Sequence, residues 1–456
     1  MARPVDGPAR VFDFFAQTPR HTPAPGDLDL YPIVADFGPA QQEFHIGLGS
    51  IAVPGVVDGL FRAHEALGHM PLERIVEQAV AVARDGYDLT PFQAYLFQVV
   101  GPIYLASEPA RRVFGKPEAP DRLLGAGDRF RNPDTADFLD ALVREGPDLF
   151  YRGEVAQRIV EDCRGRGGAL TALDLEAYRT EVRTPLVVDF GDAQILTNPS
   201  PSTGGLLIAF ALKLLEGADG LAGRWGDVDH VLSLSGALAA TDDARRNIPS
   251  DEIAGLLDPE LVATYRRVLR DHSQVRRGTT HISVIDGQGN ACALTLSNGE
   301  GAGYIAPGTG VMLNNMLGEE DINPHGLGAW RPDTRMGSMM APTIILDEGR
   351  VVAMGSGGSN RIRTAVLQVI LNLTAFGMGA AEAVSAPRLH FERGHLDVEP
   401  GWSGAAQAAL LEAFPDHRLW PEHNLFFGGV HVAVGGGRSD AAGDPRRGGA
   451  EAVLVG

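Results

Sequence analysis

The sequence predicts a mixed α/β (α+β) fold built in layers, and two patterns carry this prediction. Before Asp271, apolar side chains recur at helical spacing in several long segments. After Asp271, short β-rich segments alternate with turn signals, and one strongly apolar helical segment interrupts them at residues 360–377. Helices and strands that each present an apolar face favour layers of α and β over a β sandwich alone.

The predicted elements follow in order along the chain. The proline- and acid-rich residues 20–32 predict a loop. Gly86 predicts a helix end, and Thr171 with Asp174 has capping-box spacing. Helices are predicted at residues 56–67, 71–86, 132–146, 153–165, 171–179, 206–217 and 360–377. Strands are predicted at residues 185–190, 193–198, 280–286, 291–297, 310–315, 342–348, 351–356, 426–437 and 451–456, with an exposed loop at 271–278 and a mobile one at 437–449.

Composition narrows the classes of partner. The net charge of −19 at pH 7 repels phosphate backbones and anionic lipid, so nucleic acid is not an expected partner. No apolar run reaches the roughly 20 residues of a membrane span. Cys163 and Cys292 are too few for a disulfide framework or a cysteine metal site. The first residues lack a signal-peptide pattern, so we expect a cytoplasmic protein, or a periplasmic or secreted one if its N-terminus is truncated.

The segment GTTHISVIDGQGNACALTLSNGEG, residues 278–301, predicts a hairpin with chemistry at its open end. If the loop is Asp286–Asn290, facing residues pair so that Thr279 lies opposite Ser297. Two hydroxyl groups then meet where the strands begin and end. A hairpin with an ordinary Thr–Ser surface pair is the alternative.

Scission of the Gly278–Thr279 bond would give this hairpin a reactive end. Thr279 would gain an α-amine with a pKa of about 8 beside its own hydroxyl, so nucleophile and general base would share one residue. Ser297 would orient or polarise that hydroxyl. Gly278 lacks a Cβ and tolerates the strained backbone that attack by the hydroxyl requires.

Six short elements in a fixed order resemble the γ-glutamyltranspeptidases (γ-glutamyltransferases), and the resemblance runs from about Asp13 to the chain end. They are PSPSTGG, GTTHISVID, VMLNNMLGEED, GSMMAPT, GSGGSNRI and AGDPRRGG. The resemblance implies an N-terminal nucleophile hydrolase with a four-layer αββα sandwich. It also implies a proenzyme that cuts itself before Thr279, into a large-subunit segment, residues 1–278, and a small-subunit segment, residues 279–456, which form one structural domain.

The implied reaction is acyl transfer from a γ-glutamyl-type amide, as in glutathione hydrolysis, through a threonyl acyl-enzyme. The partners would be a small-molecule amide substrate and the two fragments of the same chain, with no metal and no organic cofactor. The resemblance assigns the oxyanion hole to the glycine element that precedes a helix, which we place at Gly358 and Ser359. A turn in which Ser359 caps that helix is the alternative.

Substrate recognition departs from the family pattern. The family binds the substrate α-carboxylate with an arginine soon after an Asp-Phe pair. Here the nearest arginine is Arg20, which either substitutes or is an ordinary surface residue. For the α-ammonium group the chain offers Glu319, which spacing favours, and Glu320; the alternative is a solvated acidic loop. Ser338 stands alone where the family has two serines.

The remaining candidates and alternatives are these. Asn298 takes the place of a substrate-contacting asparagine, in a shorter loop. His281 shares a strand face with Thr279, where a structural histidine is the expectation. A metal site at Glu320, Asp321 and His325 lacks converging ligands.

Two alternatives to the implied function stay open. Glutaryl-like or other amino-acyl amides are alternative substrates. A truncated or degenerate non-catalytic homologue is an alternative function, because the glycine-rich strand that precedes Asp-Phe in the family is missing here.

Overall fold

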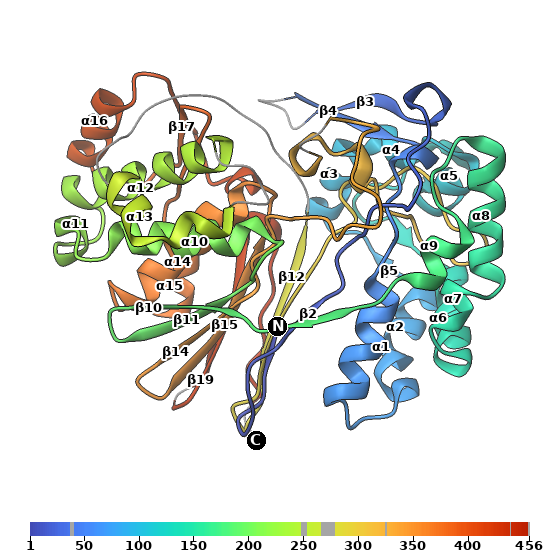
Figure 1. The fold of residues 1–456 in the computed structure, drawn as a ribbon, viewed down its shortest axis with the longest axis horizontal. Helices are drawn as coiled ribbons and strands as arrows, with labels where there is room; N and C mark the ends of the chain where they lie inside the picture. Colours follow the sequence, from blue (N-terminus) through green and yellow to red (C-terminus); the bar gives the residue numbers. More distant parts are fainter. Residues whose placement is uncertain (37–40, 248–252, 266–278, 324–325, 438, 455–456) are drawn as a thin grey trace. The chain divides into compact units, whose positions relative to one another are not determined.

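The computed structural model describes residues 1–36, 41–247, 253–265, 279–323, 326–437 and 439–454. The chain divides into two compact units (Figure 1). Unit 1 comprises Met1–Val11, Val182–Leu296 and Gly337–Gly456, and unit 2 comprises Phe12–Glu181 and Ser297–Met336. The short strands β2 (Val11–Asp13) and β9 (Glu181–Arg183) lie where the chain passes from one unit to the other. Both segments flanking the predicted cleavage site therefore contribute to both units.

The core of unit 1 is an antiparallel sheet of six strands. Its alternate side chains point to two different apolar clusters: Ile195, Ile345 and Val352 to one, and Leu196, Ile344 and Ala353 to the other. A sheet that buries both faces must be covered on both sides. In spatial order its strands are β10 (Leu186–Phe190), β11 (Ala193–Thr197), β14 (Thr343–Asp347), β15 (Arg350–Gly357), β19 (Gly429–Gly435) and β20 (Asp440–Ala442).

A three-stranded sheet covers one of these faces. Its order is β1 (Ala2–Arg3), β13 (Ala291–Leu296) and β12 (Thr280–Ile285), and β12 and β13 pack against β15. Small residues allow the two sheets to approach, since a Cβ at Gly355 would overlap the His281 ring. On the opposite face of the hairpin Ile282 and Val284 are about half exposed.

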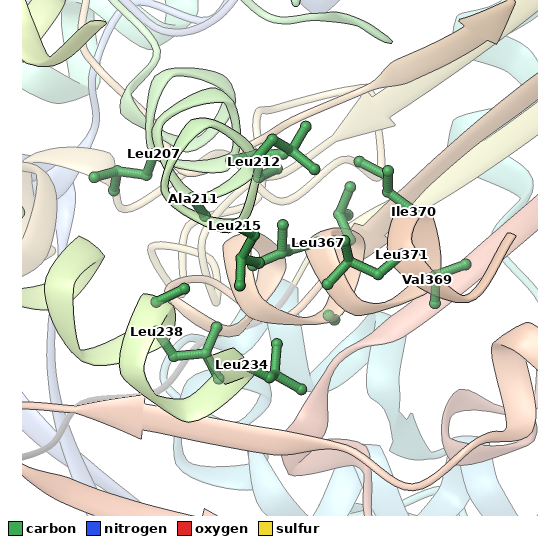
Figure 2. Close-up of a cluster of buried hydrophobic side chains, with 14 of the residues drawn as sticks. Leu207, Ala211, Leu212, Leu215, Leu234, Leu238, Leu367, Val369, Ile370 and Leu371 are labelled. Atoms are coloured by element: carbon green, nitrogen blue, oxygen red, sulfur yellow. The ribbon is translucent and has the colours of Figure 1, made fainter. Parts of the chain in front are cut away.

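Helices cover the other face of the six-stranded sheet. Figure 2 shows leucine and other aliphatic side chains of α10 (Thr203–Leu215), α12 (Val228–Asn247) and α14 (Arg361–Thr374) gathered in one cluster. The side chains of α14 are buried from Arg361 to Leu373, which explains why apolar residues occur on all sides of this helix. Unit 1 is therefore layered as helix, sheet and sheet. Its other helices are α11 (Asp219–Ala222), α13 (Pro259–Tyr265), α15 (Ala380–Ser385) and α16 (Gly404–Ala413), and a further sheet contains β16 (Leu389–Glu392), β17 (His395–Val398) and β18 (His417–Leu419).

Unit 2 is mainly helical. Its largest apolar cluster joins α6 and α8 to the residues around Ile51 and Leu313. The helices are α1 (Val56–Leu67), α2 (Leu72–Asp85), α3 (Pro91–Val99), α4 (Gly101–Tyr104), α5 (Glu108–Phe114), α6 (Pro133–Glu145), α7 (Asp148–Tyr151), α8 (Glu154–Arg166) and α9 (Ala172–Ala177). Paired strands are β3 (Tyr31–Asp36) with β4 (Gln41–Ile46), β5 (Tyr87–Asp88) with β8 (Arg129–Phe130), and β6 (Gly115–Lys116) with β7 (Ala119–Leu123).

Most predicted elements of both units are confirmed. Each predicted helix is present, the Thr171–Asp174 capping box forms, and Gly86 ends α2 with φ +80°. Two predicted strands are wrong. Residues 310–315 are irregular, because the side chains of Asn314 and Asn315 bind main-chain groups elsewhere in unit 2. Residues 451–454 form no strand.

The predicted mobile loop at residues 437–449 is also wrong over its described part, residues 437 and 439–449. Strand β20 pairs with β19, and residues 445–447 form a short 3-10 helix anchored by Asp444. The exposed loop predicted at residues 271–278 lies outside the described residues. Among the described residues, no helix has the combination of length and apolar character that a membrane crossing needs.

Candidate active site

The β12–β13 hairpin has the predicted register. Ile285 pairs with Ala291, so the loop is Asp286–Asn290, and the ladder continues to Thr280 paired with Leu296. The Asp286 carboxylate accepts hydrogen bonds from the main-chain N–H groups of Gln288 and Asn290, which fixes the loop length. The ladder ends one residue before the predicted Thr279–Ser297 pair, so that pair stays a prediction.

Thr279 directly precedes β12 and lies half-buried against the end of β15. A Cβ at Gly357 would overlap the carbonyl oxygen of Thr279, so only glycine permits this approach. The structure thus brings the predicted nucleophile next to the glycine element, although about 80 residues separate them in the sequence. Gly278, the other side of the predicted cleavage site, lies outside the described residues.

His281 is a buried structural histidine, as expected. Its Nδ1 lies 2.7 Å from the Thr295 hydroxyl and its Nε2 lies 2.9 Å from the Ser283 hydroxyl. Because Ser283 donates its own proton to the carbonyl of His431, it accepts from Nε2–H. Burial lowers the pKa of His281 to about 3, so the ring is neutral near pH 7. Both ring nitrogens bind hydroxyls of the β12–β13 hairpin, and Ser283 continues the chain of hydrogen bonds to β19 of the other sheet.

The predicted oxyanion element forms a tight turn between β15 and α14. Gly358 has φ +124° and Ser359 has φ +48°, a left-handed conformation that is uncommon for a residue with a side chain. Their carbonyls accept the N–H groups of Arg361 and Ile362, which start the helix. Asn360, rather than Ser359, is the N-cap residue. The turn therefore lies at the positive end of the α14 dipole.

The C-terminal AGDPRRGG element supports this turn, a role that sequence reasoning missed. A Cβ at Gly358 would come within 3.1 Å of Nη2 of Arg447. The segment is held by Asp444, whose carboxylate accepts from Arg388 (2.7 Å) and from the main-chain N–H groups of Val430 and Arg446. Burial opposes ionisation of Asp444, but the charges of Arg388 and Arg446 outweigh it and lower its pKa. The two adjacent arginines of this motif, Arg446 and Arg447, were the sequence signal that could have indicated this supporting role.

Ser338 is buried at the start of α10, and its contacts there are made by its main chain. Its carbonyl accepts from the N–H groups of Thr203 (2.9 Å) and Gly204 (3.2 Å) and from the hydroxyl of Ser202 (2.9 Å). A Cβ at Gly204 would overlap the carbonyl of Met339. The PSPSTGG and GSMMAPT elements therefore bind each other, which explains their glycines.

In unit 2 the structure brings together two predicted substrate-binding residues, Asn298 and Glu319. The Asn298 carbonyl accepts the N–H groups of Gly301 and Asn315, both at 3.2 Å. The Asn315 side chain in turn accepts from Gly301 N–H at 3.3 Å. Gly299, with φ +65°, leaves no room for a Cβ between Asn315 Oδ1 and Glu319 Oε1.

Two carboxylates of the LGEED segment differ in burial. Glu319 is buried, with 4% of its surface exposed, whereas Glu320 is exposed. Ser297 Oγ accepts the N–H group of Gly299, so it belongs to the same loop. The substrate-binding role of either carboxylate stays a prediction. Of the suggested metal ligands, His325 lies outside the described residues, and no cluster of metal-ligating side chains occurs among the residues described.

Arg20 is exposed and paired with another side chain. Its Nη1 lies 2.7 Å from the Asp333 carboxylate, whose other oxygen accepts from Gln17 at 2.6 Å. The Asp-Phe element is held instead by Arg335, a buried arginine that sequence reasoning missed. It donates to the Asp13 carbonyl (2.8 Å) and to the Tyr178 hydroxyl (2.8 Å).

Comparison with known proteins places this geometry in a family. The fold matches that of a cephalosporin acylase from Bacillus halodurans, with a TM-score of 0.79 at 20% identity, over 98% of this chain and 84% of that one. The fold is therefore of the N-terminal nucleophile hydrolase type. The gamma-glutamyltranspeptidase family model matches residues 10–454, and the chain belongs to that family.

Two curated relatives show the range of this family. The chain is 32% identical to the glutathione hydrolase proenzyme of Escherichia coli K12, over 81% of this chain and 69% of that protein. It is 30% identical to the acylase ACY 1 proenzyme of a Pseudomonas species, strain SE83, over 90% of this chain and 76% of that protein. The relatives of this chain thus include a hydrolase and an acylase, and the names of these two proteins both describe a proenzyme.

Proposed function

We propose that the chain is a self-processing amidohydrolase and acyltransferase that uses Thr279 as its nucleophile. The observation that carries this proposal is the contact between Thr279 and Gly357 within unit 1. It sets the residue next to the Gly358–Ser359 turn and the N-terminal end of α14. When a nucleophile near a helix N-terminus attacks a carbonyl group, negative charge develops on the carbonyl oxygen. The helix dipole and the unpaired main-chain N–H groups at that end stabilise this charge.

Maturation follows from the same hydroxyl. Thr279 Oγ attacks the carbonyl carbon of Gly278, the peptide nitrogen leaves as the α-amine of Thr279, and an ester joins the two residues. Water then hydrolyses the ester, which leaves a carboxylate on Gly278 and restores the hydroxyl. The products are a fragment ending at Gly278 and one starting at Thr279.

Catalysis then repeats this chemistry on a substrate. The α-amine of Thr279 takes the hydroxyl proton while Oγ attacks the substrate amide, and it returns the proton to the leaving amine. Gly358 and Ser359 supply main-chain N–H groups to the tetrahedral oxyanion. Water, or an acceptor amine, attacks the resulting threonyl ester and releases the acyl group, with Ser297 orienting the nucleophile.

The substrate is an amide of a γ-glutamyl-type acid, with Asn298 and Glu319 as binding residues for its ammonium end. Glu319 is favoured over Glu320 because it is buried beside Gly299. Arg20 would bind the substrate α-carboxylate, and Ser338 would be a further substrate-binding residue. The Arg20–Asp333 ion pair supports a second candidate substrate class, since a paired arginine binds a carboxylate less strongly: acyl groups without a free α-carboxylate.

A denaturing gel tests the proposed self-processing, and a panel of anilide substrates tests the proposed substrate class. Wild-type protein should split into two fragments on incubation, whereas Thr279→Ala should remain one band. The mature protein is then given γ-glutamyl, glutaryl and 5-aminovaleryl anilides, which differ in their ammonium and carboxylate groups. A strong preference for γ-glutamyl anilide would exclude the second substrate class. An intact wild-type band without release of any anilide would favour a non-catalytic homologue.

A further inference from the structure

The side chain of Asn360 binds residues behind the proposed oxyanion turn rather than the helix that it precedes. Asn360 is fully buried and is the N-cap residue of α14, yet its side chain caps no N–H group of that helix. Its Nδ2 donates to Oε1 of Glu392 at 2.6 Å, and its Oδ1 accepts from Nη1 of Arg245 at 3.3 Å. The end of α12, the end of β16 and the start of α14 therefore meet at this amide.

Glu392 is a buried carboxylate with a defined charge state. Arg245 donates to its Oε1 at 3.2 Å, and Nε2 of His390 lies 3.1 Å from its Oε2. Burial opposes ionisation, but the hydrogen bond from His390 and the charges of His390, Arg245 and Arg363 lower the pKa of Glu392 to about 2. Burial also lowers the pKa of His390, whose Nε2 faces Glu392 and whose Nδ1 lies 2.9 Å from the Thr364 hydroxyl.

The turn in front of Asn360 needs such support. Ser359 is in the left-handed region, and a residue with a side chain stays there only where its surroundings hold it. Asn360, its immediate neighbour, is fixed by hydrogen bonds to the buried Glu392 and the partly buried Arg245. Arg361 is fixed on the other side by a 3.0 Å hydrogen bond to the Phe426 carbonyl. Both anchors lie within two residues of Ser359.

We propose that Glu392 is a positioning residue for catalysis: by holding Asn360, it fixes the direction of the main-chain N–H groups of the Gly358–Ser359 turn. The inference rests on the proposed function, because it assigns this turn to the oxyanion. The negative charge of Glu392 does not oppose the oxyanion, since Arg245 lies against the same carboxylate oxygen and compensates it. An uncompensated carboxylate behind a helix N-terminus would weaken anion binding there.

A double-mutant cycle tests whether Glu392 acts through Asn360. Glu392→Ala and Asn360→Ala should each lower kcat for anilide hydrolysis at least about tenfold, because a single oxyanion donor is worth about 100-fold or more. KM should stay within about twofold, and the double variant should lose no more than the worse single variant. Additive losses, or a loss confined to KM, would overturn the proposal.

The matched control changes a carboxylate–arginine pair of the six-stranded sheet. Asp347→Asn breaks the 2.6 Å pair with Arg350, which lies at the opposite end of β15 from the turn. It should leave kcat unchanged. If Glu392→Ala does not fold, Glu392→Gln replaces it. The amide oxygen of glutamine can still accept the hydrogen bond from Asn360, so we expect a smaller loss of kcat in this variant. An equal loss in Asp347→Asn would make the effect a general one and contradict positioning.

Hydrogen exchange separates this inference from the proposed function. In a Thr279→Ala background, which cannot react, adding Glu392→Ala should speed exchange of the main-chain N–H groups of residues 358–362, and adding Asp347→Asn should not. If wild type hydrolyses no anilide but exchange changes as expected, the proposed function fails and the structural support stands. If wild type is active and the Glu392 variants change neither kcat nor exchange, the inference fails and the function stands.

Discussion

The region around Thr279 in unit 1, the proposed nucleophile, and the region around Glu319 and Arg20 in unit 2, the proposed binding residues, are built from different kinds of atoms. Around Thr279 the structure depends on main-chain atoms and on missing side chains, as at Gly357 and Gly358. Around Glu319 and Arg20 it depends on side-chain amides, carboxylates and an ion pair. The comparison teaches that the proposed chemistry depends on particular glycines, whereas the proposed specificity depends on pairs of side chains that substitution can change.

The largest effect is expected where a side chain is added to the main-chain region. Gly357→Ala places a Cβ on the Thr279 carbonyl, so it should abolish processing or reduce it by more than about 100-fold. Quantifying the fragments on a denaturing gel over time measures this. Gly404→Ala is the control, because a Cβ there meets nothing within 4 Å. Normal processing in Gly357→Ala would show that the close approach is not needed.

The next largest effect, on the free energy of unfolding, is expected when the charge of Asp444 is removed. Asp444→Asn leaves Arg388 and Arg446 without their shared buried carboxylate, and breaking a buried pair of this kind costs about 3–5 kcal/mol. Urea unfolding gives the change in the free energy of unfolding. A loss below about 1 kcal/mol, as for a surface ion pair, would mean that Arg447 and the turn do not depend on this anchor.

Acid should weaken the sheet contact through His281. Its pKa is lowered to about 3 in the folded protein from 6.5, so the unfolded chain takes up a proton that the folded one refuses. Stability should therefore fall as the pH drops from 6.5 towards 3, by at most about 1.4 kcal/mol per pH unit for this group. His281→Gln should flatten this slope, and His423→Gln, an exposed control, should not. Equal slopes in all three proteins would remove His281 as the cause.

The smallest effect on stability, and the sharpest on specificity, is expected in unit 2. Asp333→Asn removes the partner of Arg20 at a cost of about 0–1 kcal/mol, because this pair is partly exposed. The released guanidinium should raise kcat/KM for glutaryl anilide several-fold over that for 5-aminovaleryl anilide. Arg112→Gln, which breaks the exposed Glu108–Arg112 pair, is the control. No change in the ratio would mean that Arg20 is an ordinary surface residue.

Sequence reasoning succeeded where a short local pattern fixes the geometry. The five-residue loop set the hairpin register, and the apolar run at residues 360–377 gave α14. The glycines of GSGGSNRI marked a close approach of main chains, although not that Thr279 would be the partner.

Sequence reasoning failed where contacts between side chains far apart in the sequence determine the structure. Residues 310–315 have a strand-like composition, but Asn314 clamps both main-chain groups of Ala52 and prevents a strand. The Arg20–Asp333 pair spans more than 300 residues and has no local signature. Glu392 and Arg245 are charged residues in elements that sequence alone left unexplained, and only packing brings them to Asn360.

The most direct test of the account is the identity of the new chain end in the active protein. Mass analysis and N-terminal sequencing should find a fragment that begins with Thr279, and an amine-reactive label on that residue should stop anilide hydrolysis. Turnover of an anilide by protein whose Gly278–Thr279 bond is intact would contradict the account.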